Sequence, residues 1–247
     1  MSNDKKVDQE TVLLTGASGF IGLHCVKQLI QSGFKVRGTV RSLEKQKLVQ
    51  EVMAANNVDT KNIEFNLLDL NSDSGWEASM VGCKYVMHVA SPFWIANPKN
   101  DAEMMTPAVD GTLRVLRAAK KAKVKRVILT SSIVSMMSSI RRGLFTPEDW
   151  TDVDYPNLST YIKSKTLAEK AAWKFLDENK GPSAPALVVI APGGVFGPPL
   201  GTDITGQSLT VLAKTLDGKI PMVPDAAFPM VDVRDVAELH VKALKNN

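Results

Sequence analysis

The chain has 247 residues, of which 44% are hydrophobic and 23% are charged, and its formal net charge is +4. This length permits one large α/β domain, or a large domain with a small lobe. The composition is that of a globular protein that needs no disulfides. We therefore expect Cys25 and Cys83, which lie in apolar stretches, to be reduced structural thiols.

The charge and hydropathy patterns argue against several classes of protein. Residues 1–10 are polar and no apolar run approaches the ~20 residues that cross a bilayer, so we expect neither a secretory signal nor a membrane span. The densest basic run, residues 120–126, is typical of a helix end, because no aromatic residue or second basic patch accompanies it. We expect a cytoplasmic monomer or homodimer that binds no metal, membrane or nucleic acid.

Strand-like and helix-like segments alternate along the chain. Short apolar runs rich in β-branched residues predict strands over residues 11–15, 35–40, 63–68, 85–90, 126–131 and 186–191. Apolar residues at helical spacing predict helices over residues 21–31, 43–55, 76–80, 104–122 and 160–178. Repeated βα alternation predicts a doubly wound parallel sheet of the Rossmann type with right-handed crossovers.

Two regions interrupt this alternation. Residues 132–158 form a long connection, and residues 192–229 are rich in glycine and proline, with one helical stretch near 208–216. Long connections in such a sheet lie beyond the carboxyl ends of the strands, where substrates bind. A last strand near 230–233 leads into a helix over 234–244. We expect a dinucleotide-binding domain over residues 1–191, a substrate-lobe segment over 192–229, and a return strand and helix over 230–247.

Three glycines, Gly16, Gly19 and Gly22, stand between the first predicted strand and the first predicted helix. This spacing supplies a tight turn, a close approach of the backbone to a pyrophosphate, and close packing of helix on strand. The N-terminus of the helix then offers N–H groups and a positive dipole end to the phosphates. Because the glycines follow a strand and open a βαβ unit, they predict a dinucleotide site.

The end of the second predicted strand indicates which dinucleotide binds. An NAD enzyme usually places an acidic residue about 20 residues beyond the glycines, to accept from the ribose 2′-OH. Residues 37–42 contain no carboxylate, and Arg41 can form a charge-assisted pair with a 2′-phosphate. Arg37, Lys45 and Lys47 add positive potential nearby. The alternative is that Arg41 is a solvated cation. We predict NADP(H) as the cofactor.

Tyr161 and Lys165 are four residues apart at the start of a predicted helix, so they share a face. A tyrosine has a reference pKa near ~10 and is a poor acid unless a nearby charge, such as the lysine ammonium, stabilises its phenolate. Ser132 follows a strand end from which its hydroxyl can reach the same carbonyl oxygen. A Tyr-x-x-x-Lys pair also occurs by chance, and strand-end serines such as Ser131 also cap helices.

Together these residues predict reduction of a carbonyl group. We expect hydride transfer from nicotinamide C4 to the carbonyl carbon of a small aldehyde or ketone, while Tyr161 donates a proton to the developing alkoxide. Ser132 hydrogen-bonds that oxygen, and Lys165 holds the nicotinamide ribose and lowers the tyrosine pKa. The predicted activity is NADPH-dependent carbonyl reduction.

Eight short motifs are spread along the chain: TGASGFIG (15–22), GTVR (38–41), HVASPF (88–93), PAVDGT (107–112), TSS (130–132), YIKSKTLAEKAAW (161–173), APGGVFGP (191–198) and VDVRDVAELHV (231–241). By these motifs the sequence resembles the extended short-chain dehydrogenase/reductases. Within them it is similar to the branch of dihydroflavonol reductases, cinnamoyl-CoA reductases and fungal methylglyoxal or ketone reductases. The resemblance covers essentially the whole chain and implies a Rossmann-type domain with a small C-terminal substrate lobe.

The resemblance also implies a role for each site residue. Ser132, Tyr161 and Lys165 would form the catalytic triad, and Arg41 would bind the 2′-phosphate. The cofactor-binding residues would be Gly16, Ser18, Gly19, Phe20, Ile21, Gly22, Arg41, Lys45, Asp69, Leu70, Val89, Ala90, Ser91, Thr130, Ser131, Tyr161, Lys165, Pro192, Gly193 and Val195. The substrate contacts would be Phe93, Ser132, and Met136 with its neighbour Met137. For the two methionines, ordinary packing is at least as good an explanation as substrate contact.

Two features depart from the family pattern. The connection from Ser132 to Tyr161 is shorter than in the plant members, which argues against their bulky flavonoid or phenylpropanoid substrates. The chain also ends just after residues 231–241, where family members continue for several dozen residues, so we expect the substrate lobe to be truncated. In a truncated chain cofactor binding is better supported than turnover, activity is poor, and exposed apolar surface favours association.

Three other functions stay open at this point. A nucleotide-sugar epimerase or dehydratase shares the fold and the triad, but such enzymes usually hold NAD(H) through an acidic residue where this chain has Arg41. A 3β-hydroxysteroid dehydrogenase-like activity also fits the motifs. An NADP-sensing regulator without turnover typically lacks the tyrosine–lysine pair, so Tyr161 and Lys165 favour an enzyme.

Overall fold

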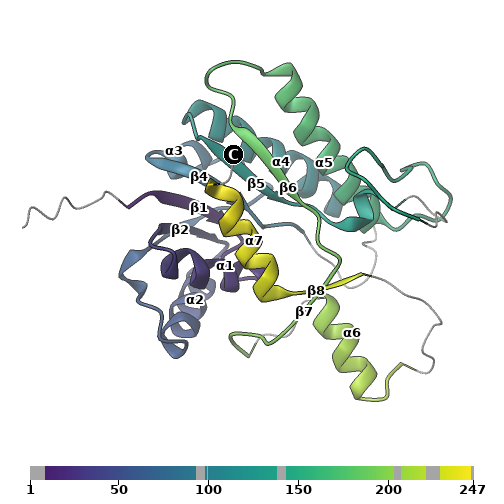
Figure 1. The fold of residues 1–247 in the computed structure, drawn as a ribbon, viewed down its shortest axis with the longest axis horizontal. Coiled ribbons are helices and arrows are strands. Elements are labelled where there is room, and N and C mark those ends of the chain that lie inside the picture. Colours follow the sequence, from purple (N-terminus) through teal and green to yellow (C-terminus); the bar gives the residue numbers. More distant parts are fainter. Residues whose placement is uncertain are drawn as a thin grey trace, which may run out of the picture.

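The computed structural model describes residues 9–92, 98, 100–137, 143–202, 207–220 and 229–245. A parallel sheet with the strand order β3-β2-β1-β4-β5-β6 runs through its centre (Figure 1). Its strands are β1 (Thr11–Thr15), β2 (Lys35–Val40), β3 (Ile63–Leu67), β4 (Cys83–His88), β5 (Arg126–Thr130) and β6 (Ala186–Ile190). All neighbouring strands of this sheet pair in parallel, which confirms the predicted Rossmann-type fold class.

Helices cover both faces of the sheet (Figure 1). They are α1 (Phe20–Gln31), α2 (Leu43–Ala55), α3 (Trp76–Met80), α4 (Ala102–Lys121), α5 (Thr160–Glu178), α6 (Gln207–Leu216) and α7 (Val233–Lys245), with short 3-10 helices η1 (Thr60–Asn62) and η2 (Ile133–Ser135). Side chains of β1 alternate between the layers, because successive residues of a strand point to opposite faces. Val12 and Leu14 pack with α1, α2 and α7, whereas Leu13 packs with α3, α4 and α5.

The predicted elements agree with the structure except at their ends. β4 begins at Cys83 and ends at His88, two residues earlier than the predicted strand over 85–90. Val89 and Ala90 leave the sheet and line a cavity at its edge. The hydropathy of these two residues continues the strand pattern, so the sequence does not mark where the strand ends. They differ from the strand residues only in lying beyond the last backbone hydrogen bond of β4.

A second, two-stranded sheet was not predicted. It pairs β7 (Gly194–Phe196) in parallel with β8 (Met230–Asp232). The predicted strand near 230–233 therefore pairs with β7 and not with the main sheet. β7 has only three residues and one of them is glycine, so its sequence carries too little periodicity to reveal a strand. The helix that follows, α7, returns to the main domain and packs on α1.

Both cysteines, Cys25 and Cys83, are buried free thiols, as expected. Within the described ranges, no helix combines the length and the apolar character that a membrane span requires. Nor does the described part of the chain contain a group of three or more histidine, cysteine, aspartate or glutamate side chains arranged to hold a metal ion.

The turn between β1 and α1 brings backbone unusually close to backbone. Gly16 has a φ of +70°, and a Cβ there would lie 3.0 Å from backbone atoms of Ala90. A Cβ on Gly22 would lie only 2.0 Å from the carbonyl oxygen of Gly16. Positions 16 and 22 therefore admit no side chain, and α1 begins directly against the turn.

We expect Gly22→Ala to lower the free energy of unfolding by about 3 kcal/mol, because the added methyl forces the helix away from the turn. Urea denaturation of the purified variant measures this loss. Gly33→Ala is the control: Gly33 has a positive φ, which Gly22 lacks, but a Cβ there meets nothing within 4 Å, so only backbone strain opposes the substitution. It should cost about 1 kcal/mol, and equal losses in the two variants would contradict the steric argument.

Candidate active site

A cavity of about 970 Å³ opens along the carboxyl ends of the central strands. Its wall combines the β1–α1 turn, the ends of β2, β4 and β5, the first turns of α5, residues 192–196 and part of α6. This volume is at the upper end of the range for small-molecule sites. Parallel α/β sheets bind their ligands at this edge, so the cavity is the candidate active site.

The β1–α1 turn forms one end of the cavity. Gly19 lies at the N-cap of α1, and among the described residues no side chain caps this helix end and no acidic residue lies in its first turn. Gly16, Ser18 and Gly22 line the cavity beside it. A helix N-terminus without a competing carboxylate attracts a phosphate through its N–H groups and its dipole.

Arg41, which follows β2, lines the same cavity together with Asp69 and Leu70. The other basic residues predicted near it have different surroundings. Lys45 is not part of the cavity wall in the described structure; its backbone N–H donates to Ser42 at the start of α2. Lys47 pairs with Glu51 one turn later on that helix, at 3.7 Å.

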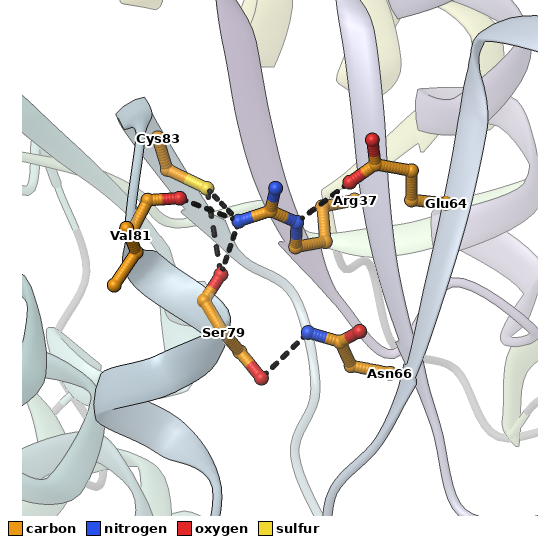
Figure 2. A network of polar contacts seen from close by, with 6 residues as sticks. All are labelled: Arg37, Glu64, Asn66, Ser79, Val81 and Cys83. Carbon is orange, nitrogen blue, oxygen red and sulfur yellow. Dashed lines mark hydrogen bonds and ion pairs between the residues drawn. The ribbon is translucent and has the colours of Figure 1, made fainter.

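The Arg37 side chain is hydrogen-bonded to groups outside the cavity, so the expectation that it adds positive potential at the phosphate was wrong. Its Nε donates to Glu64 Oε2 at 2.9 Å, and one of its terminal nitrogens donates to the carbonyl oxygens of Ser79 (2.9 Å) and Val81 (2.7 Å) and contacts Cys83 Sγ (Figure 2). Arg37 lies in the first half of β2, so its side chain reaches the end of α3 rather than the cavity. The hydrogen bonds of Arg37 therefore connect β2, β3 and the end of α3, and its role is structural.

Tyr161, Lys165 and Ser132 converge on the cavity. Tyr161 and Lys165 lie in the first turns of α5, whose N-cap Ser159 accepts from the backbone N–H of Ile162. Ser132 is the N-cap of η2 and is hydrogen-bonded to the Tyr161 phenol. Residues 29 positions apart in the chain thus form one polar group beside the glycine turn.

Burial changes the proton affinities of this group. It raises the pKa of the Tyr161 phenol, and the hydrogen bond with Ser132 opposes that effect. It lowers the pKa of Lys165 to about 8, and the negative charge of Glu169 opposes that effect. Lys165 Nζ donates to the carbonyl oxygen of Thr130 at 3.2 Å. Near neutral pH, Lys165 is therefore close to the point where its charge changes.

A buried histidine lies behind this group. His88 Nδ1 is 2.8 Å from Thr15 Oγ1, which accepts from the backbone N–H of Ala90 at 3.0 Å. His88 Nε2 is 3.4 Å from Thr112 Oγ1, which donates to the carbonyl oxygen of Ala108 at 2.7 Å. These partners assign the neutral tautomer with its proton on Nε2. Burial, and then the charge of Lys165, lower the pKa of His88 to about 3.

Most predicted site residues line this one cavity. Three do not fit that description: Lys45 lies away from it, Met136 is absent from its wall while Met137 is present, and Phe93 lies outside the described residues. Other residues of the cavity wall were not predicted from the sequence, among them Asn71, Trp76, Glu103, Phe196, Leu209 and Val211. The glycine- and proline-rich composition of residues 192–229 signalled the region of Leu209 and Val211, but not these individual residues.

Residues 12–247 match the profile of the NAD dependent epimerase/dehydratase family. The chain therefore belongs to this family, the extended short-chain dehydrogenase/reductases, as its motifs predicted. It is 36% identical to an uncharacterized oxidoreductase of Schizosaccharomyces pombe, over 95% of this chain and 74% of that protein. It is 35% identical to a cinnamoyl-CoA reductase of Medicago truncatula, over 95% of this chain and 72% of that protein.

Its structure is similar to the crystal structure of yeast methylglyoxal/isovaleraldehyde reductase complexed with NADPH. The TM-score is 0.84 at 30% sequence identity, and the match covers 96% of this chain and 75% of that chain. The likeness therefore extends over the sheet, the helices and the cavity edge.

We expect the buried neutral imidazole of His88 to make the protein sensitive to acid. Its pKa is about 3 in the folded chain and near 6.5 when unfolded, so the unfolded chain binds the extra proton first as the pH falls. The contribution to stability is complete above pH ~6.5 and declines by about 1.4 kcal/mol per pH unit until about pH 3. Urea denaturation between these limits measures the slope.

His88→Gln keeps an acceptor and a donor but does not titrate. The variant should lose stability at neutral pH. Its free energy of unfolding should also fall less steeply with acid than that of the natural chain, because one fewer proton is taken up on unfolding. An unchanged slope would show that His88 does not carry this sensitivity.

Proposed function

We propose that this protein is an NADPH-dependent reductase of small aldehydes or ketones. The observation that carries the proposal is the convergence of Tyr161, Ser132 and Lys165 on one cavity that also contains the glycine turn and Arg41. A reductase needs a dinucleotide site, a proton donor and a group to polarise the carbonyl, and this wall holds candidates for all three.

The cavity fits a dinucleotide phosphate. Side chains at positions 16 and 22 would fill the turn, and their absence leaves the backbone open to a pyrophosphate at the start of α1. Arg41 lines the adjoining wall and suits a 2′-phosphate, with which a guanidinium forms charge-assisted hydrogen bonds. The similar yeast reductase was crystallised with NADPH, which supports the same cofactor here.

Bound NADPH would supply a hydride to the carbonyl carbon of the substrate. Tyr161 donates its phenolic proton to the oxygen of that carbonyl as negative charge develops there, and Ser132 donates a hydrogen bond to the same oxygen. Lys165, as an ammonium, stabilises the phenolate that Tyr161 becomes. Ser132 and Lys165 are buried and Tyr161 is half-buried, which strengthens these interactions, because little water competes with them.

The wall near Ser132 is apolar. Ile133, Val134 and Met137 follow Ser132 in the chain and line the cavity, and Leu209 reaches it from α6. A hydrocarbon wall beside a pair of hydroxyl groups suits a small carbonyl compound with apolar substituents. The relative named as a methylglyoxal/isovaleraldehyde reductase acts on compounds of this size, which supports the same class of substrate.

We expect Tyr161→Phe to lower kcat by about 10³-fold, because the variant has no proton to donate. The absorbance of NADPH, followed against a panel of small aldehydes and ketones with NADH in parallel, measures the rate. The affinity for NADPH should stay within about twofold, since a cofactor site depends mainly on the phosphate contacts. The exposed Tyr155, changed to phenylalanine, is the matched control and should keep full activity.

Full turnover by Tyr161→Phe would rule out this assignment of the proton donor. Binding of NADPH by the natural chain without turnover on any carbonyl of the panel would favour a sensing role over a reductase.

We expect Arg41→Gln to weaken NADPH binding by about 10- to 100-fold, the loss typical of a charged hydrogen bond, while NADH binding changes little. Titration calorimetry with both cofactors measures this preference. The matched control is Arg37→Gln, which removes a guanidinium four residues earlier, within β2, where it belongs to the structural network with Glu64. Arg37→Gln should lower stability and leave the NADPH preference unchanged; loss of preference in both variants would contradict the role of Arg41.

A further inference from the structure

Glu169 is a buried carboxylate in the third turn of α5, with 8% of its surface exposed. Its Oε2 accepts from the hydroxyl groups of Ser131 (2.5 Å) and Ser135 (2.8 Å), and its Oε1 accepts from the indole of Trp173 at 3.4 Å. A carboxylate costs several kcal/mol to bury unless it is paired and hydrogen-bonded. Three donors on one carboxylate therefore identify a polar centre built into the interior.

The two serines flank the serine of the candidate active site. Ser131 precedes Ser132, and Ser135 ends the 3-10 turn that Ser132 begins; Ser135 Oγ also lies 2.8 Å from the carbonyl oxygen of Ser132. One carboxylate oxygen thus holds the chain on both sides of the residue that is hydrogen-bonded to Tyr161. The position of the Ser132 hydroxyl relative to the phenol depends on this clamp.

Glu169 also lies one turn beyond Lys165 on the same helix. Both side chains, with His88, line a second small cavity of about 10 Å³, roughly the space of one water molecule. Burial favours the uncharged amine of Lys165, and the charge of Glu169 favours the ammonium.

The other ionisable groups around Lys165 do not replace this charge. His88 on β4 is neutral, and Tyr161 on α5 is a protonated phenol near neutral pH. Asp101, at the N-cap of α4, accepts from the Thr160 hydroxyl, and Glu103 on α4, which packs against α5, lines the large cavity.

We propose that Glu169 is a positioning residue that keeps Lys165 charged and holds Ser132 against Tyr161 through Ser131 and Ser135. This role rests on the proposed function, because it serves the proton transfer assigned to Tyr161. The two parts of the role are separable: Glu169→Gln keeps an oxygen acceptor for the serines but removes the charge, and Ser135→Ala keeps the charge but removes one bond of the clamp.

Heteronuclear NMR of lysine-labelled protein measures the charge directly, with the Lys165 signal assigned by its absence in Lys165→Met. We expect Glu169→Gln to lower the pKa of Lys165 by about one pH unit or more, Glu169→Asp to give an intermediate value, and Ser135→Ala to leave it in place. The graded Glu169→Asp variant tests the same point if Glu169→Gln fails to fold. An unchanged pKa in both Glu169 variants overturns the proposal.

The pH dependence of turnover supplies the second readout. Activity should fall with rising pH as Lys165 loses its proton, and this alkaline limb should move to lower pH in Glu169→Gln by the shift that NMR measures. Ser135→Ala should lower kcat, leave KM for NADPH unchanged and leave the limb in place. A limb that stays in place in Glu169→Gln overturns the proposal. If Glu169→Gln shifts the Lys165 titration but the natural chain shows no turnover, the role of Glu169 in charging Lys165 holds and only the reductase function is rejected.

Discussion

The arrangement of the whole site depends on the contact between Gly22 and the carbonyl oxygen of Gly16. Because a Cβ at position 22 would lie 2.0 Å from that oxygen, α1 can begin directly against the turn only with glycine there. This contact points the N-terminus of α1 at the cavity and places the helix face on which α7 packs. The strand before α7, β8, pairs with β7 and so holds residues 194–196 in the cavity wall.

A second condition is that the polar side chains behind the cavity are buried with partners. The end of β5 joins two helices through Thr130: its carbonyl oxygen accepts from Lys165 on α5, and its hydroxyl is 2.7 Å from Nε2 of His240 on α7. The other ring nitrogen of His240, Nδ1, lies 2.7 Å from the carbonyl oxygen of Val236. Such networks specify one arrangement of their helices, since any other would leave buried polar groups unpaired. A reactive group needs this fixed surrounding more than it needs added stability.

Arg37 and Arg41 show the limit of inference from a local sequence pattern. Arg37 lies in the first half of β2 and Arg41 follows its end, and in the sequence both suggested positive potential for a phosphate. In the structure Arg41 lies at the cavity, whereas Arg37 is held by Glu64 and by carbonyl oxygens at the end of α3 (Figure 2). Four residues along a strand span about 13 Å, so only the residue at the strand end can reach the ligand edge.

Local sequence was enough to predict the α/β alternation, the glycine turn and the spacing of Tyr161 and Lys165, because these depend on local periodicity and on residue types with few alternatives. Strand β7 depended on the tertiary structure, since it is stabilised by pairing with β8, which lies far along the chain. The contribution of α6 to the cavity wall did so too, because no local pattern marks which of its residues face the cavity. The role of Glu169 also depended on the tertiary structure, because in the sequence it resembles any other polar residue of a helix. Its place between Ser131, Ser135 and Lys165 follows from how α5 packs against the end of β5 and η2.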